Sequence, residues 1–162
     1  AKEFLPSTAC GFYDPRVATH IMDAAEYIRG RVGHYDVIIV DSTDPEGPGE
    51  ALFSRAFYER AKAALRPGGI LAVQGESAFF RGDLVRRIVG DIRSLFPVCG
   101  YALTLVPTYG GSIGICVGSL SGQVSAPSRV PDGELMGKLK YYTPETHKAA
   151  FALPAFIQRL TR

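Results

Sequence analysis

The chain has 162 residues, of which 46% are hydrophobic and 21% are charged, which suits one globular domain with a real core and argues against disorder. Its 18 basic and 16 acidic side chains are interspersed and give a formal net charge of +2, so neither nucleic acid nor a membrane is indicated as a partner. No stretch approaches the roughly 18 consecutive apolar residues of a membrane span.

The cysteines and histidines show no pattern of metal ligation. Cys10, Cys99 and Cys116 are far apart and lack the paired spacing of a zinc site or a disulfide framework. We expect reduced thiols in a cytoplasmic protein, with no metal and no other cofactor. The sequence starts at Ala1 instead of Met and has no signal-peptide core, so we expect a fragment or a processed chain.

Strands and helices alternate in the first half of the chain. Residues 17–22 favour a strand, and residues 24–31 predict a helix that closes at Gly33. Residues 35–40 are apolar at nearly every position, which is typical of a strand covered on both faces in a parallel sheet. This strand stops at Asp41.

The next elements repeat this order. Residues 50–65 place apolar side chains three and four positions apart, which predicts an amphipathic helix, and residues 66–69 end it with the sequence RPGG. Residues 70–74 predict a second buried strand, and residues 83–96 predict a second amphipathic helix.

The last two predicted strands, residues 101–106 and 113–119, are too close for a helical crossover, so they should pair as an antiparallel hairpin. A loop at 121–131 leads to short helices at 144–151 and 154–160, each with Pro in its first turn. The alternation predicts an α/β fold built on a mostly parallel sheet with a C-terminal antiparallel hairpin.

Ligands of such sheets bind just beyond the carboxyl ends of the strands. This rule selects Asp23, residues 41–48 and residues 74–76. Asp41 and Asp44 place two carboxylates in a loop stiffened by prolines, which favours a positively charged ligand. The alternative is that these aspartates only cap turns, and the residues alone leave both interpretations open.

The run at residues 35–48 reads YDVIIVDSTDPEGP and resembles the signature of the polyamine aminopropyltransferase (spermidine synthase) family. The likeness continues in QGE at 74–76, PTY at 107–109, LKYY at 139–142 and HKAAFALP at 147–154. It therefore covers essentially the whole chain, as the C-terminal two-thirds of such an enzyme.

This resemblance implies a Rossmann-like, methyltransferase-type sheet whose N-terminal part is missing. Residues 1–162 would then form a partial catalytic domain that lacks the N-terminal β-domain and the first sheet strands. The missing strands would lie in mid-sheet, between the strand at 17–22 and the strand at 35–40. We therefore expect the isolated chain to be inactive.

The resemblance also implies a reaction: an aminopropyl group moves from decarboxylated S-adenosylmethionine to putrescine, giving spermidine and methylthioadenosine. An amine with a pKa near ~10 must first lose a proton to become a nucleophile. By likeness to the family, Asp41 is the base and Tyr109 orients the attacking nitrogen. Asp44 and Gln74 would hold the amine.

The nucleoside site is also assigned by resemblance. Asp23 would hold the adenine amino group, Ala24 would also bind substrate, and the loop from Asp44 to Pro48 would lie against the purine. Asp23 has a second interpretation as the N-cap of the helix that starts at Ala24, and the two roles are compatible.

Two other functions stay open. One is a putrescine or other amine N-methyltransferase on the same scaffold, and the other is a catalytically silent regulatory subunit. The acceptor could be putrescine, cadaverine or spermidine, with putrescine as the default. The partners expected are these small molecules and, for the full-length form, a second copy in a homodimer.

Overall fold

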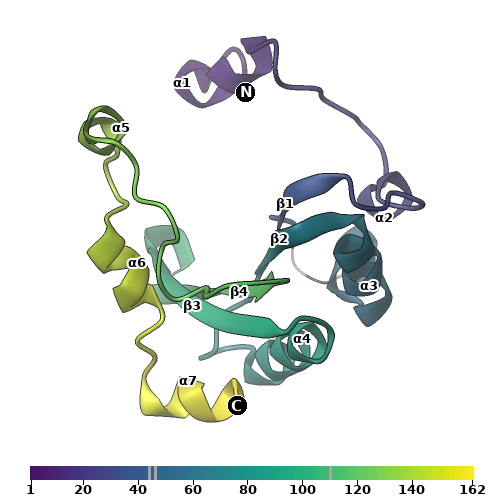
Figure 1. Ribbon diagram of the computed structural model, residues 1–162, viewed down its shortest axis with the longest axis vertical. Helices are drawn as coiled ribbons and strands as arrows, with labels where there is room; N and C mark the ends of the chain where they lie inside the picture. The colour runs from purple at the N-terminus through teal and green to yellow at the C-terminus, as the bar shows by residue number, and fades with distance from the viewer. Residues whose placement is uncertain (44, 46, 110) are drawn as a thin grey trace.

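One mixed sheet of four strands organises the molecule. The computed structural model describes residues 1–43, 45, 47–109 and 111–162. The strands lie in the order β1-β2-β4-β3, from β1 at the top of Figure 1 to β3 below. β1 and β2 are parallel, and β4 is antiparallel to both β2 and β3. Their bounds are β1 Tyr35–Val40, β2 Leu65–Gln74, β3 Val98–Val106 and β4 Gly111–Ser119.

The helices are mostly short. The longer two are α3 and α4, and three 3-10 helices, labelled η, connect other elements. The bounds are α1 Pro6–Ala9, η1 Cys10–Tyr13, α2 Ala24–Tyr27, η2 Gly47–Phe53, α3 Arg55–Ala64, α4 Gly82–Leu95, η3 Pro107–Tyr109, α5 Gly133–Lys138, α6 Pro144–Ala150 and α7 Ala155–Leu160. No helix among the described residues is long and apolar enough to cross a membrane.

The core lies between α3, α4 and one face of the sheet. In α4, the buried residues Val85, Ile88, Val89 and Ile92 recur every three or four positions and therefore share one side of the helix. They pack with Leu71 and Val73 of β2 and Cys116 of β4 in one apolar cluster. These side chains alternate along each strand, so they point to the same face of the sheet.

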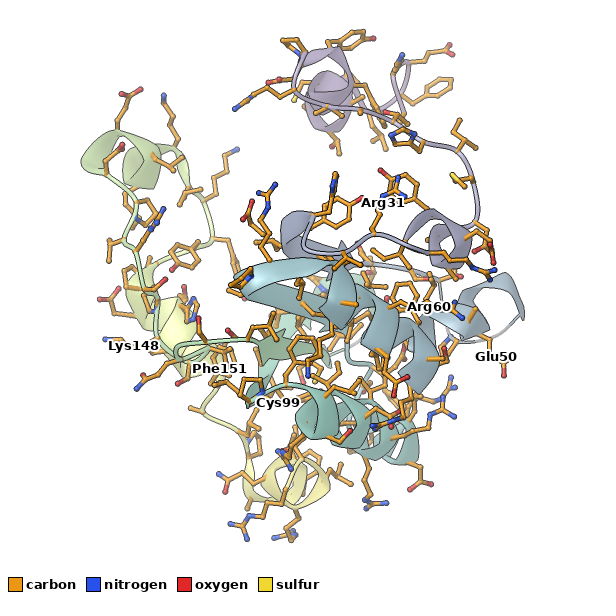
Figure 2. The ribbon with its side chains drawn as sticks, turned by 45° about the vertical axis from the view of Figure 1, so that its right-hand side comes forward. Arg31, Glu50, Arg60, Cys99, Lys148 and Phe151 are labelled. Atoms are coloured by element: carbon orange, nitrogen blue, oxygen red, sulfur yellow. The ribbon has the colours of Figure 1, made fainter. Side chains whose placement is uncertain are left out.

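The C-terminal segment covers part of the other face. Ala102 and Thr104 of β3 point away from the core and line a cavity whose far wall is α6. Phe151, labelled in Figure 2, packs at the end of α6 so closely that a Cβ on Gly100 would lie 2.8 Å from its ring. α6 and α4 therefore flank β3 and β4 from opposite sides, as Figure 1 shows.

Several sequence predictions are confirmed. The strand at 35–40 is β1, and the strand at 70–74 is the second half of β2. The last two strands form the predicted antiparallel hairpin, and the helix at 83–96 is α4 within one residue at each end. The α/β fold class is confirmed as well.

The predicted strand at 17–22 is wrong. These residues form an extended connection between η1 and α2 (Figure 1), and the Ile21 side chain is 98% exposed. A strand exists only where a neighbour pairs with its backbone, and among the described residues no strand pairs with 17–22. The sheet of this chain ends at β1, so the strands expected beyond its outer edge, and with them the gap in mid-sheet, stay a prediction.

The prediction that β1 is covered on both faces is also wrong. Val40 is buried against the core, but Val37 and Ile39 are 53% and 73% exposed. Among the described residues, no strand pairs with the outer edge of β1 and no helix covers the face that carries Val37 and Ile39. Both the edge and that face of β1 are therefore open.

Two predicted helices are shorter than expected. The helix at 24–31 is only the single turn α2, and Gly30 and Gly33, with positive φ angles of 74° and 55°, keep the segment after it from continuing as a helix. The helix at 50–65 divides into η2 and α3 at Ser54, whose hydroxyl accepts the backbone N–H of Phe57 at 3.2 Å and so starts a new helix.

Candidate functional site

The candidate site lies at the carboxyl ends of β1 and β2. Val40 of β1 is paired in register with Val73 of β2. The residues that follow, Asp41 and Gln74, therefore leave the sheet side by side. They line a groove of about 480 Å³, which we call the sheet-end groove, whose other walls are mainly apolar side chains of β3 and β4.

A second cavity of about 310 Å³ lies on the other side of Asp41, between α2 and β1. Ala24, Ile28 and Phe57 form apolar parts of its wall, and Tyr27 adds an aromatic ring. Asp41 lines both the second cavity and the sheet-end groove. An exposed acidic residue therefore lies where two adjacent binding spaces meet.

Asp23 is the N-cap of α2. Its Oδ1 accepts the backbone N–H of Glu26 at 2.9 Å, so the capping interpretation is confirmed. This cap holds the start of α2 in place and with it Ala24, which lines the second cavity. The adenine contact assigned to Asp23 stays a prediction.

For three of the predicted site residues the structure gives no side-chain geometry. Asp44 lies outside the described residues. The backbones of Pro48 and Tyr109 belong to η2 and η3, but their side chains lie outside what the structure describes. Their assigned contacts with substrate stay predictions.

Sequence reasoning missed the group that holds Gln74. The side-chain amide Nε2 of Gln74 donates to Glu76 Oε1 at 2.9 Å, and the Glu76 side chain is almost fully buried. The hydroxyl of Tyr101 in β3 donates toward the carbonyl oxygens of Gly75 and Glu76, at 3.0 and 2.9 Å. The only sequence signal for Glu76 was its position just after the end of a strand. The sequence near Tyr101 gave no signal of its role.

Burial raises the pKa of Tyr101 above its usual value, with smaller contributions from Cys116 and Glu76. Its hydroxyl therefore stays protonated at neutral pH and can donate a hydrogen bond. Among the described residues, no cluster of three or more His, Cys, Asp or Glu side chains could hold a metal ion.

Comparisons with known proteins identify relatives of one kind. A family model described as the spermine/spermidine synthase domain matches residues 1–125. A spermidine synthase from Dictyostelium discoideum is 45% identical over 157 residues, which are 96% of this chain and 55% of that protein. A polyamine aminopropyltransferase from Moorella thermoacetica is also 45% identical, over 98% of this chain and 56% of that protein.

The fold agrees with these sequence relatives. A crystal structure of a spermidine synthase in complex with the transition-state analogue AdoDATO superposes with a TM-score of 0.87 at 34% identity. The match covers 99% of this chain and 56% of that one. The chain thus spans just over half the length of the proteins that it matches.

Proposed function

Because this chain belongs to the spermine/spermidine synthase domain family, we propose that it carries the amine and nucleoside sites of a spermidine synthase. The reaction would transfer the aminopropyl group of decarboxylated S-adenosylmethionine to putrescine. The products would be spermidine and methylthioadenosine. This function has one chemical requirement, a proton acceptor placed between an amine and a sulfonium nucleoside.

The observation that carries the proposal is the position of Asp41. Asp41 borders both the sheet-end groove, which contains Gln74, and the cavity beside α2, and it is the only ionisable residue that the two linings share. An amine in the groove and a nucleoside in the cavity would meet at this carboxylate. The negative charge suits both partners, because the amine and the sulfonium centre are cations.

The proposed chemistry follows from this arrangement. Asp41 accepts a proton from the putrescine ammonium group, and the freed nitrogen lone pair attacks the methylene carbon next to the sulfonium. The C–N bond forms as the C–S bond breaks, and the sulfur leaves in neutral methylthioadenosine. Holding the two substrates in line is the main contribution of the protein to such a displacement.

The other site residues receive supporting roles in the proposal. Gln74 and Asp44 bind the amine, and Tyr109 orients its attacking nitrogen. The nucleoside occupies the cavity beside α2, where Ala24 lies and where the N-cap Asp23 holds the helix start. Asp23 would hold the adenine amino group, and the loop ending at Pro48 would lie against the purine.

We further propose that this chain is a partial catalytic domain, which lacks an N-terminal β-domain and the first strands of the sheet. The support is the open edge of β1 together with the exposed apolar side chains of Val37 and Ile39. A strand edge and an apolar face left open in this way are costly to solvate and prone to aggregation. By "complete enzyme" we mean this chain together with the segments that would finish its sheet.

Assayed alone, the 162-residue chain should produce no spermidine. The amine and nucleoside sites border β1, and with the outer edge of this strand open they should lack their remaining walls. The measurement is spermidine formation from putrescine and decarboxylated S-adenosylmethionine, with the chain alone and with the complete enzyme. Turnover by the chain alone would contradict the proposal of a partial domain.

The reaction class itself is tested with two sulfonium donors. Given putrescine and either decarboxylated or ordinary S-adenosylmethionine, the complete enzyme should form spermidine with the first donor and little product with the second. Mass spectrometry of the amine products decides the outcome. Methylputrescine as the main product would assign an N-methyltransferase, and no product with either donor would assign a silent subunit.

Two further features of the complete enzyme are proposed. A cytoplasmic location is supported by Cys10, Cys99 and Cys116, which are all free thiols. A homodimer is supported only by the family resemblance, and sedimentation of the complete enzyme would test it.

A further inference from the structure

The turn after β2 holds a residue in a backbone conformation that its side chain disfavours. Glu76 has a φ of 60°, and no other non-glycine residue in the described chain has a positive φ. Left-handed backbone is uncommon for residues with a Cβ, and such strain persists only where the surroundings impose it. Strained residues of this kind cluster at binding sites, so this turn merits a functional explanation.

Backbone hydrogen bonds and one buried tyrosine impose this conformation. The N–H of Gly114 in β4 donates to the Glu76 carbonyl at 2.8 Å, and the Gly75 N–H donates back to the Gly114 carbonyl at 2.7 Å. The Tyr101 hydroxyl reaches the carbonyl oxygens of Gly75 and Glu76 from β3. The turn is therefore fixed by both strands of the hairpin.

The fixed turn places the buried Glu76 carboxylate against the side chain of Gln74. Gln74 Nε2 donates to Glu76 Oε1 at 2.9 Å, and Glu76 is only 6% exposed. An ionised carboxylate only accepts hydrogen bonds, whereas a glutamine amide has a donor end and an acceptor end. The pairing therefore selects one of the two amide orientations, with the NH₂ group toward Glu76.

The selected orientation leaves the acceptor end of Gln74 for a ligand. Gln74 lines the sheet-end groove, and in the described part of the chain no group donates to its Oε1. A carbonyl oxygen in the groove suits a ligand that donates N–H bonds. With the amide reversed, its NH₂ group would instead face the same N–H donors and oppose their binding.

We propose that Glu76 is a positioning residue for amine binding, which holds Gln74 so that its carbonyl oxygen faces the amine substrate. The inference rests on the proposed function, since it assumes that an amine occupies the sheet-end groove. Glu76 itself needs no contact with the amine. It acts through Gln74, and Tyr101 acts through Glu76.

The test is Glu76→Gln in the complete enzyme. A glutamine at this position can either donate or accept, so it no longer selects one orientation of the Gln74 amide. We expect the KM for putrescine to rise about tenfold, the scale of one hydrogen bond lost to a ligand. The kcat at saturating amine and the KM for the nucleoside should stay within about twofold. Glu134→Gln is the matched control, because it removes a carboxylate that pairs with Lys138 on the exposed surface of α5.

A second readout does not depend on turnover. The side-chain NH₂ signals of Gln74 in a ¹⁵N NMR spectrum should shift strongly in Glu76→Gln and not in Glu134→Gln. If Glu76→Gln fails to fold, a double variant exchanges the two residues, Gln74→Glu together with Glu76→Gln. It keeps the hydrogen bond between the side chains at positions 74 and 76 and leaves a carboxylate facing the sheet-end groove. That variant should bind putrescine at least as well as the unmodified enzyme, and weaker binding would overturn the proposal.

The outcomes separate this inference from the proposed function. An unchanged putrescine KM in Glu76→Gln would overturn the positioning role. So would a variant whose kcat falls and whose KM values for both substrates rise by similar factors together with a lower Tm, because that result shows a role in stability only. If the unmodified enzyme transfers no aminopropyl group, the proposed function fails. In that case the NMR signal of the Gln74 amide still tests the role of Glu76. If this signal does not shift in Glu76→Gln, the positioning role is overturned.

Discussion

Replacing Asp41 by Asn in the complete enzyme should lower kcat by roughly 100- to 10,000-fold, the usual contribution of a general base. Asn keeps the size and polarity of the side chain but cannot accept the proton that the attacking ammonium group must lose. The measurement is kcat with both substrates saturating. Asp36→Asn is the matched control, since it removes an exposed carboxylate of β1, the strand that Asp41 follows; this carboxylate pairs with Arg66 at 2.8 Å, and its loss should leave kcat unchanged.

The pH dependence of the Asp41→Asn variant gives a sharper form of the same prediction. Without a base, the variant depends on putrescine that is already neutral, and this fraction rises about tenfold per pH unit below the amine pKa of about 10. The rate of the variant should therefore rise steeply with pH, and its deficit should be largest at neutral pH. Near-normal turnover at about pH 7 would remove Asp41 as the base.

The sequence predicted that Asp41 and Gln74 lie at one edge of the sheet, because that placement follows from strand patterning alone. Two apolar runs ending at Asp41 and Gln74 predict neighbouring parallel strands, and residues that follow such strands share one edge of the sheet. The register of Val40 with Val73 then brings the two side chains together. Chemical roles, by contrast, came from resemblance to a family and not from the pattern.

The errors at 17–22 and on β1 have one physical origin. Strand propensity records how well a side chain fits a pleated, partly buried surface, and it says nothing about whether a neighbour is present. Residues 17–22 have the composition of a strand but no partner strand in the described chain. Ile39 is an apolar residue expected to be buried, but no described element covers its side chain. Local sequence cannot report whether a neighbouring element is there to pair with it or cover it.

The support behind Gln74 escaped prediction for a different reason. Glu76 follows the strand closely in sequence, but its left-handed backbone is imposed by Gly114 and Tyr101, which lie 25 or more residues away along the chain. Such contacts depend on the hairpin register and on the room that glycines leave. A pattern of apolar residues carries no information on either.

Among substitutions that add a single methyl group to a glycine of the hairpin, Gly114→Ala should lower the stability of the protein most. A Cβ at Gly114 would lie 1.9 Å from both the Cζ and the hydroxyl oxygen of Tyr101, whose ring is buried and cannot turn aside. We expect the free energy of unfolding to fall by about 3 kcal/mol, the upper range for overpacking a core. Thermal and denaturant unfolding of the complete enzyme would measure it.

The control and a double variant connect this clash to the site. Gly111→Ala lies on the same strand with no atom within 4 Å of the new Cβ, so its effect should stay within about 1 kcal/mol. Tyr101→Ala removes the ring that the methyl group added at Gly114 would strike, so the double variant should lose less stability than the sum of the two single variants. Strict additivity would contradict the clash. Because Tyr101 also clamps the turn that carries Glu76, Gly114→Ala should weaken putrescine binding as well, whereas Gly111→Ala should not.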